Sequence, residues 1–291
     1  MKPKKYALVT GTGTGLGFAT AKLLKEKGWN VIGTIIPSQS PDELKKLGII
    51  PIVTDISKLD SVKELYDFVS KEVGEEGLAA LINVAGLAAV AGGIIEGVSE
   101  DRIKTLFEVN VFGTLRMCTT FLPLLRKYGP GRIVNVASSG VRVPTSFSGI
   151  YAISKYAVEG ITNALRYELP IFGIQVTSIE PGAMDTPMTA DNEANMAKTW
   201  EMMPTHVRDL YYDKLKVPLE YMSNMMKVMS PPEDVAKVIL KALKAKRMKI
   251  RYMAGKGVKM MPFLQRFLGE NLFERMLLKV QKMPRPKFDK K

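Results

Sequence analysis

The chain has 291 residues, of which 46% are hydrophobic and 24% are charged, and its formal net charge is +13. This composition is typical of one globular domain with a substantial core, and it excludes a disordered chain and a membrane-spanning bundle. The one cysteine, Cys118, lies in the apolar run 115–125, which excludes an internal disulfide and predicts a buried thiol.

Short β-branched runs alternate with longer amphipathic stretches along most of the chain. Strands are predicted at 6–10, 31–36, 51–56, 80–84, 132–137 and 174–180. Helices are predicted at 16–27, 61–73, 100–117, 119–128 and 151–172. The alternation indicates an α/β fold of the Rossmann type, a doubly wound parallel sheet with helices on both faces. Ligands bind such sheets at the carboxyl ends of the strands.

A glycine-rich loop, residues 10–17, lies between the first predicted strand and the first helix, where backbone N–H groups hold a pyrophosphate. It fits the pattern T-G-x-x-x-G-x-G and departs from the strict G-x-G-x-x-G fingerprint. The alternative is a glycine-rich turn without a ligand. The loop residues predicted to contact a dinucleotide are Gly11, Thr12, Thr14, Gly15, Leu16 and Gly17.

The second strand ends in Thr34-Ile35-Ile36-Pro37-Ser38, without the acid that holds a ribose 2′-OH or the arginine that holds a 2′-phosphate. Charge therefore does not decide between NAD and NADP. Asp55, with Ile56 beside it, closes the third predicted strand and stands on the correct edge to contact the adenine. The alternative for Asp55 is a helix cap before Ser57.

Tyr151 and Lys155 are four residues apart at the start of a predicted helix, so both side chains share one face. A nearby cation lowers the pKa of a phenol, and a ketone that accepts hydride needs a proton on its oxygen. Ser138 follows a strand at the binding edge, where its hydroxyl can bond the same oxygen. Ser139 is the competing serine, and either one can instead satisfy backbone in the following turn.

The alternation of strand-like and helix-like runs weakens after Pro181-Gly182. It resumes at 231–234, where two prolines and two acids predict a helix start. We divide the single domain, 1–291, into a dinucleotide-binding and catalytic core (1–182), a substrate cap (183–230) and a basic amphipathic extension (256–291). The cap holds nine of the seventeen methionines, which predicts a bulky apolar substrate; ordinary packing is the alternative. His206, the only histidine, is interpreted as structural.

Residues 256–291 carry ten Lys or Arg against three acids, and 260–283 space apolar residues helically. This extension can lie on an anionic membrane surface, cover the cleft or contact another subunit. Because a strand begins near the amino terminus and no apolar run reaches roughly 20 residues, we expect no signal peptide or anchor. We expect a cytoplasmic protein, peripheral to a membrane if the extension binds lipid, and no nucleic-acid partner, since no basic-aromatic motif is present.

With these motifs in order, residues 5–255 resemble the short-chain dehydrogenase/reductase family. Asn83-Val84-Ala85-Gly86 is similar to the family's N-N-A-G, with valine as a departure, and Asn110 falls where the family has its helix asparagine. The resemblance implies that Asn110 positions a water linking Lys155 to solvent. It also implies cofactor contacts from residues after the fourth and sixth strands, namely Asn83, Ala85, Gly86, Pro181, Gly182 and Thr186, with Tyr151 and Lys155 between them.

Within the family, the stretches around Tyr151–Lys155 and Glu180-Pro181-Gly182 resemble the branch of retinol, 17β-hydroxysteroid and 3-hydroxybutyrate dehydrogenases, which favours NAD. We therefore predict an NAD(P)-dependent oxidoreductase that interconverts an apolar alcohol and its ketone or aldehyde without a metal, with Asn110, Ser138, Tyr151 and Lys155 as the catalytic set. The alternatives are a non-catalytic NAD(P)-binding sensor or scaffold, and an epimerase or dehydratase on the same fold. We expect a homodimer or homotetramer.

Overall fold

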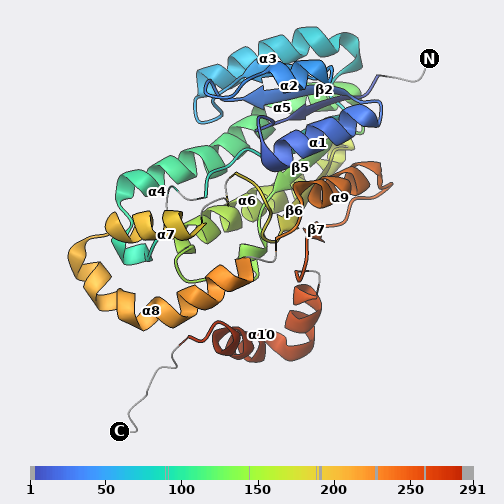
Figure 1. Ribbon diagram of the computed structural model, residues 1–291. Coiled ribbons are helices and arrows are strands. Elements are labelled where there is room, and N and C mark those ends of the chain that lie inside the picture. The colour runs from blue at the N-terminus through green and yellow to red at the C-terminus, as the bar shows by residue number, and fades with distance from the viewer. Residues whose placement is uncertain are drawn as a thin grey trace.

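Seven parallel strands form one sheet in the order β3-β2-β1-β4-β5-β6-β7 (Figure 1). The computed structural model describes residues 4–88, 90, 92–143, 145–187, 189, 192–226, 229–258 and 260–283. The strands are β1 (Tyr6–Val9), β2 (Asn30–Ile35), β3 (Ile50–Val53), β4 (Ala80–Asn83), β5 (Arg132–Val136), β6 (Gln175–Pro181) and β7 (Arg251–Ala254). The predicted fold class and its six strands are confirmed, and β7 is an additional strand. β3 ends at Val53, so Asp55 and Ile56 follow this strand rather than close it.

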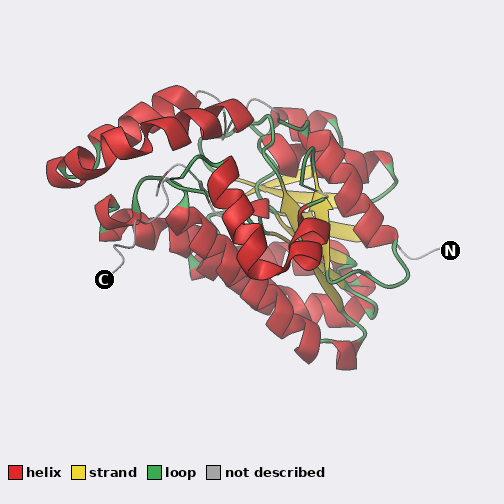
Figure 2. Cartoon of the chain, turned by 90° about the horizontal axis from the view of Figure 1, so that it is seen from below, coloured by secondary structure: helices red, strands yellow, loops and turns green. Residues whose placement is uncertain are grey.

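Alternate residues of the strands enter two separate cores, because successive side chains of a strand point to opposite faces. In β1, Ala7 and Val9 join one core, and Tyr6 and Leu8 join the other. The first core is covered by α1 (Gly15–Glu26), α2 (Asp42–Lys46) and α9 (Pro232–Lys244). The second core is covered by α3 (Leu59–Val73), α5 (Thr114–Tyr128) and α6 (Gly149–Glu168). Figure 2 shows the sheet enclosed between these helices.

The segment from Glu100 to Tyr128 is helical throughout, so the predicted division at residue 118 is wrong. It consists of α4 (Glu100–Phe107), a π-helical turn (Glu108–Gly113) and α5. Cys118 lies inside α5 and is buried, as predicted. The irregularity falls earlier, around Asn110, and wide turns of this kind are frequently found at functional sites.

The predicted cap contains two helices, α7 (Asn192–Glu201) and α8 (Thr205–Met226), which lie away from the sheet (Figure 1), and α8 contacts the short turn Ile95–Gly97 before α4. The helix start predicted at 231–234 is confirmed by α9. The helix predicted at 260–283 is present as α10 (Met261–Val280), but Gly269 has φ 70° and ψ 166° and divides it at a kink. None of the helices in the described part of the chain has the length and apolar character needed to cross a bilayer.

Candidate active site

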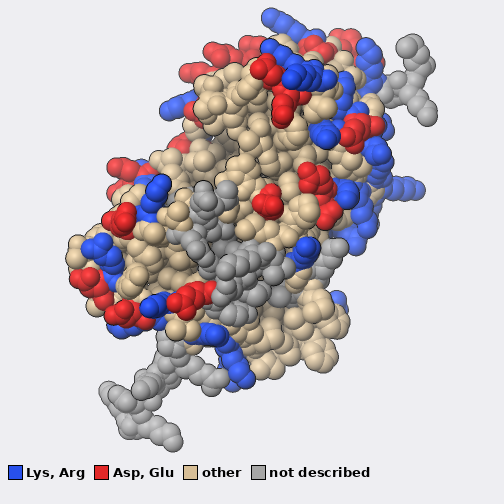
Figure 3. All heavy atoms as spheres, in the orientation of Figure 1, with Lys and Arg blue, Asp and Glu red and all other residues tan. Residues whose placement is uncertain are grey.

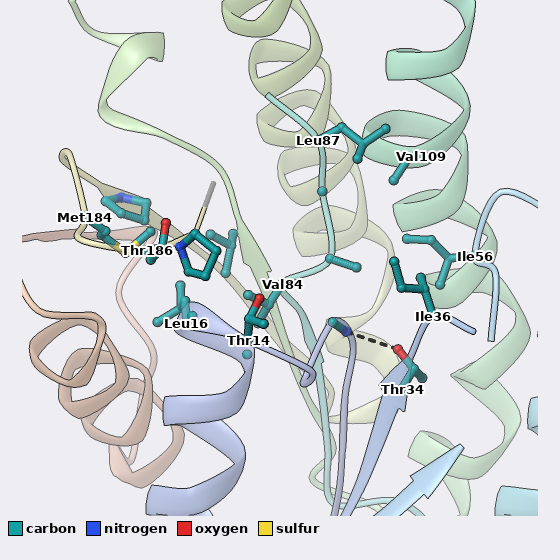
Figure 4. A pocket seen from close by; sticks show the side chains of 18 of the residues that line it. Thr14, Leu16, Thr34, Ile36, Ile56, Val84, Leu87, Val109, Met184 and Thr186 are labelled. Atoms are coloured by element: carbon teal, nitrogen blue, oxygen red, sulfur yellow. Dashed lines mark hydrogen bonds between the residues drawn. The ribbon is translucent and has the colours of Figure 1, made fainter. Parts of the chain in front are cut away.

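A cleft lies at the carboxyl edge of the sheet, where the predicted site was expected. Figure 4 shows Leu16, Met184 and Thr186 at one end of this cleft and Ile36 and Ile56 at the other. Most of the predicted site residues line it: Gly11, Thr14, Gly15, Leu16, Gly17, Asp55, Ile56, Ala85, Gly86, Ser138, Tyr151, Lys155, Pro181, Gly182 and Thr186. Three others, Thr12, Asn83 and Asn110, are buried beside the cleft instead.

The glycine loop is held against the segment after β4 by Thr10. Its hydroxyl oxygen accepts hydrogen bonds from the backbone N–H groups of Val84 and Ala85, at 2.9 and 3.0 Å. Gly11 has φ +69°, and a Cβ on it would lie 2.9 Å from the Ala85 Cα. A Cβ on Gly17 would clash with the Gly11 carbonyl oxygen. The loop can therefore present its backbone to a ligand only because glycine occupies these positions.

Thr12 shapes this loop from behind. Its hydroxyl donates to the Thr34 carbonyl oxygen at 3.0 Å, and its side chain is fully buried against Gly33. The backbone N–H of Gly11 donates to the Thr34 hydroxyl at 3.1 Å, the bond drawn in Figure 4. The motif identified Thr12 correctly as part of the loop, but its side chain points away from the cleft.

The far end of the cleft is formed by the loop after β2 and by Asp55. Gln39, which the sequence analysis missed, lines the cleft, lies against Gly13 and accepts a hydrogen bond from the Ile36 N–H at 3.2 Å. Asp55 lines the cleft and also accepts from the Ser57 N–H and hydroxyl, at 2.9 and 2.6 Å. Both interpretations of Asp55, a wall of the site and a cap of the turn before α3, are therefore compatible with its position.

Ser138, Tyr151 and Lys155 converge at the middle of the cleft. Ser138 follows β5, accepts from the Gly140 N–H at 3.1 Å, and lies close enough to Tyr151 to lower the pKa of its phenol. Lys155 lies one turn beyond Tyr151 on α6, with its ammonium 5.8 Å from the Tyr151 ring centroid. That ammonium donates to the Val136 carbonyl oxygen at 3.0 Å and is 5% exposed. Of the two candidate serines, Ser138 lines the cleft.

Burial shifts the pKa of both groups on α6. It raises the pKa of the Tyr151 phenol, while the nearby Ser138 side chain acts in the opposite direction. It lowers the pKa of the Lys155 ammonium to about 8. The lysine alone would lower the pKa of the phenol, as predicted from the sequence, but burial outweighs it, so the predicted direction for the Tyr151 pKa is reversed in this structure.

Asn110 joins the loop after β4 to α6. Its side-chain oxygen accepts from the Leu87 N–H at 2.7 Å, and its amide donates to the Leu87 carbonyl and the Ser154 hydroxyl at 2.9 and 3.1 Å. A Cβ on Gly86 would lie 3.1 Å from the Asn110 Oδ1 and 3.4 Å from the Lys155 ammonium. Asn110 therefore lies next to the lysine, and its predicted role in a water relay stays a prediction.

Asn83 is part of the interior rather than the cleft. Its amide donates to the Asn135 side-chain oxygen at 2.9 Å and to the Cys118 sulfur at 3.3 Å. Burial raises the pKa of the Cys118 thiol to about 12, so this cysteine is inert as a nucleophile. Asn83 thus supports the segment that carries Ala85 and Gly86.

The segment after β6 closes the cleft from the other side. Pro181, Gly182 and Thr186 line it, and the Thr186 methyl would meet a Cβ on Gly15 at 3.2 Å. A ligand held by the glycine loop would therefore also contact this segment. Together with the loop, where added Cβ atoms would fill the cradle, this arrangement fits a dinucleotide. No group of three or more His, Cys, Asp or Glu side chains in the described parts of the chain is placed to hold a metal.

A doubly wound sheet with this glycine loop and a Ser-Tyr-Lys cluster defines a class of dinucleotide-dependent oxidoreductases. The family model described as short chain dehydrogenase matches residues 5–197. Human short-chain dehydrogenase/reductase family 9C member 7 is 32% identical, over 89% of this chain and 84% of that protein. Rat 17-beta-hydroxysteroid dehydrogenase type 6 is 35% identical over 71% and 66%, and mouse retinol dehydrogenase 16 is 30% identical over 96% and 90%.

The fold agrees with these sequence matches. A short-chain dehydrogenase from Streptomyces avermitilis superposes with a TM-score of 0.74 over 97% of both chains, at 24% identity. The chain belongs to the short-chain dehydrogenase/reductase family. It is an NAD(P)-binding oxidoreductase that acts on CH–OH groups, as the sequence predicted.

Proposed function

We propose that this oxidoreductase interconverts an apolar secondary or primary alcohol with its ketone or aldehyde, using NAD, and that Ser138, Tyr151 and Lys155 perform the proton chemistry. The observation that carries the proposal is that Ser138, Tyr151 and Lys155 line the same cleft, with the Lys155 ammonium 5.8 Å from the Tyr151 ring centroid and hydrogen-bonded to the Val136 carbonyl oxygen. Two hydroxyl groups that meet beside a buried cation can hold one carbonyl oxygen between them.

In the reducing direction, the Ser138 hydroxyl donates a hydrogen bond to the carbonyl oxygen and Tyr151 gives its phenolic proton to that oxygen. A nicotinamide held between the glycine loop and the segment after β6 would supply the hydride for the carbonyl carbon. The resulting Tyr151 phenolate is stabilised by the Lys155 ammonium. Because the pKa of Lys155 is about 8, this group is protonated in most molecules at neutral pH. Asn110 would hold the proton path from Lys155 to solvent, while Thr12 and Asn83 support the loops that hold the cofactor.

The walls of the far end support NAD rather than NADP. A 2′-phosphate is normally bound by arginine or lysine, and among the described residues lining the cleft the one cation is Lys155, which lies at the catalytic centre. Gln39 instead offers an uncharged amide beside Gly13, which suits a ribose hydroxyl. Initial rates followed at 340 nm should be higher with NAD than with NADP, and a Gln39→Arg variant should reverse that order. Equal rates with both cofactors would contradict the assignment.

The cap supports a bulky apolar substrate. Trp200, Met203, Val207, Leu215 and Leu219 form a buried cluster that contacts the loop before α6. The related proteins from rat and mouse are named for 17-beta-hydroxysteroids and retinol. We expect retinol and a 17β-hydroxysteroid to be oxidised with a higher kcat/KM than 3-hydroxybutyrate. Activity confined to the small hydroxy acid would overturn this part of the proposal.

The extension has two parts with different surroundings. Phe273 is buried, and Met283 packs on the cap cluster and accepts a hydrogen bond from Ser146 at 3.3 Å. Phe263 and Phe267 stack on each other with their side chains 70% and 78% exposed. Figure 3 shows few charged side chains on the surface where α10 lies.

We propose that the part of α10 before the kink at Gly269, which carries Phe263 and Phe267, contacts an anionic membrane surface from the cytoplasmic side. Phe263→Ser/Phe267→Ser should then lose co-flotation with phosphatidylserine vesicles that the parent shows, whereas Ile171→Ser, on an exposed site elsewhere, should not. The alternative partner is a second copy in a homodimer or homotetramer. Light scattering distinguishes the two, because only a subunit contact would change the mass when both phenylalanines are replaced.

A further inference from the structure

Four charged side chains are gathered behind the catalytic cluster, and the proposed chemistry uses none of them. Arg142 donates to both carboxylate oxygens of Glu180, at 2.9 and 3.3 Å, and lies 3.5 Å from Glu159. Arg251 lies 3.4 Å from Glu180 and 3.5 Å from Glu159. The Glu180 side chain is completely buried and that of Glu159 is 7% exposed.

Each member of this group except Arg251 is attached to a segment that lines the cleft. Arg142 ends the short helical turn that begins directly after Ser138. Glu159 lies on α6, two turns beyond Tyr151. Glu180 is the residue before Pro181-Gly182 on β6. Arg142 therefore ties together three segments that are distant in sequence and adjacent at the site.

Stability alone is a weak reason for such a group. Desolvation of a buried ion pair is costly, and apolar side chains of similar volume often stabilise a core equally well. Here burial, together with Glu180, raises the pKa of Glu159 to about 7, and the Glu159 Oε2 has no hydrogen-bond partner in the described structure. Burial acts the same way on Glu180, but its hydrogen bond with Glu159 and its contacts with Arg142 outweigh it and lower the pKa. The facing groups are Arg142, Arg251, Tyr156 and the Ser178 hydroxyl, which donates to Glu159 at 3.1 Å.

We propose that Arg142 is a positioning residue: through its two-pronged contact with Glu180 and its contact with Glu159, it fixes the loop of Ser138 against the helix of Tyr151. The planar guanidinium supplies a geometry that a lysine ammonium cannot reproduce. Arg142 itself touches neither substrate nor cofactor, since it is not among the residues that line the cleft. The inference rests on the proposed roles of Ser138 and Tyr151.

The test is Arg142→Lys, which keeps the charge and loses the fork. Oxidation of retinol, or of a 17β-hydroxysteroid if retinol is not turned over, should show kcat reduced about tenfold, because small misplacements at a reacting centre are costly. The dissociation constant for NADH, measured by fluorescence, should stay within about twofold, because the glycine loop and the Asp55 wall do not contact the group. Arg132→Lys is the matched control, since Arg132 is half-buried at the opposite end of the strand that precedes Ser138 and bonds the Ala242 carbonyl.

The pH profile separates positioning from general loosening. Ser138 lowers the pKa of Tyr151, so a displaced Ser138 should move the alkaline rise of kcat to higher pH. An unchanged profile in Arg142→Lys, or a loss of kcat matched by Arg132→Lys, would overturn the inference while leaving the proposed function intact. Full activity in Tyr151→Phe would overturn both.

If Arg142→Lys folds poorly, Glu180→Gln provides the second test. It keeps the shape and hydrogen-bonding capacity of the side chain and removes the charge that orients the fork. Kinetic coupling to Ser138→Ala is then the readout: when Arg142 acts through Ser138, Glu180→Gln should lower the residual kcat of Ser138→Ala by less than twofold. Full additivity of the two effects would contradict the proposed positioning.

Discussion

The core, residues 4–182 together with α9 and β7, and the cap with its extension, residues 183–230 and 256–283, are held together by different kinds of contact. In the core, hydrogen bonds join segments far apart in sequence, such as Thr10 to Ala85 and Asn110 to Leu87. In the cap, the contacts are those of an apolar cluster around Trp200. Directional bonds fix a geometry, whereas methionine and aromatic packing adapts to what it covers. We therefore expect the first region to determine the reaction and the second the range of substrates.

The two regions meet at Phe147, between Ser138 and Tyr151. Its ring packs on Trp200 with 4.9 Å between ring centroids, and its φ of 72° is a conformation that side chains other than glycine rarely adopt. The loop of Ser138, the proposed catalytic serine, is thus held by Arg142 on its core side and by Trp200 on its cap side. Perturbing the two sides should have separable consequences.

The largest effect is expected at the proton donor. Tyr151→Phe keeps the ring and removes the hydroxyl, so kcat should fall about 10²- to 10⁴-fold, the range supplied by general acid–base catalysis. The dissociation constant for NADH should change little, because the glycine loop is untouched. Tyr167→Phe is the control on the same helix, since Tyr167 is 89% exposed. A Tyr151→Phe variant as fast as the parent would show that the core does not perform the proposed chemistry.

The next effect concerns the cofactor. Gly17→Ala places a methyl group against the Gly11 carbonyl and must displace the glycine loop, so the NADH dissociation constant should rise at least about tenfold. Gly160→Ala is matched to it, because Gly160 is also in a helix and an added Cβ there meets no atom within 4 Å. That control should leave binding unchanged and raise the melting temperature slightly. Fluorescence titration with NADH measures the dissociation constant of each variant. Equal affinity in the two variants would contradict the packing described for the loop.

The sequence predicts the core well because its strands are apolar runs and its loops are motifs with a mechanism. The Tyr151–Lys155 spacing places both side chains on one face of α6, and the structure has them there. The sequence does not predict where a side chain points when that direction depends on segments distant in the chain. The glycine-loop motif spans Thr12 and the N-N-A-G motif includes Asn83, but only the partners Thr34 and Asn135 show that both point into the interior.

Other features lack a local signal. β7 is four residues long with Arg251 at its start, and it is a strand because it pairs with β6. Gln39 reaches the cleft through a turn without any motif. The Arg142–Glu180 contact joins residues 38 positions apart, so no periodicity reveals it. Gly269 lies inside an apolar pattern that continues across it, and periodicity alone does not show the kink.

A smaller and more selective effect is expected in the cap. Trp200→Ala removes the ring that packs on Phe147 and Tyr212, so KM for retinol should rise about tenfold while KM for a small alcohol such as 2-propanol stays the same. Met202→Ala is the neighbouring control, because Met202 is 55% exposed. A parallel loss toward both alcohols would mean that the cap supports the catalytic loop rather than the substrate.

The smallest effect is a pH dependence of the free energy of unfolding, which is expected from the Arg142 side of the Ser138 loop and not from its Trp200 side. Glu159 has a pKa raised to about 7 by burial and by Glu180, so it contributes stability that is present below the pKa of the unfolded chain and is lost as pH rises through about 7. Glu159→Gln cannot titrate. The parent should therefore lose stability relative to this variant between about pH 5 and about pH 8, measured by urea unfolding at each pH. Glu180 shifts the opposite way, but it is present in both proteins and its effect largely cancels in the difference.

Glu168→Gln, which removes an exposed carboxylate from the same helix, is the matched control for the loss of one acidic group. Parallel curves for the parent and Glu159→Gln would mean that Glu159 is ionised throughout this range. The four charged residues would then hold two full carboxylates against two guanidinium groups, and the core side of the loop would be rigid at every pH tested. A falling difference would mean that Glu159 ionises in the folded protein across this range, whereas the cap side, held by Phe147 and Trp200, has no titrating group in its stacking contact.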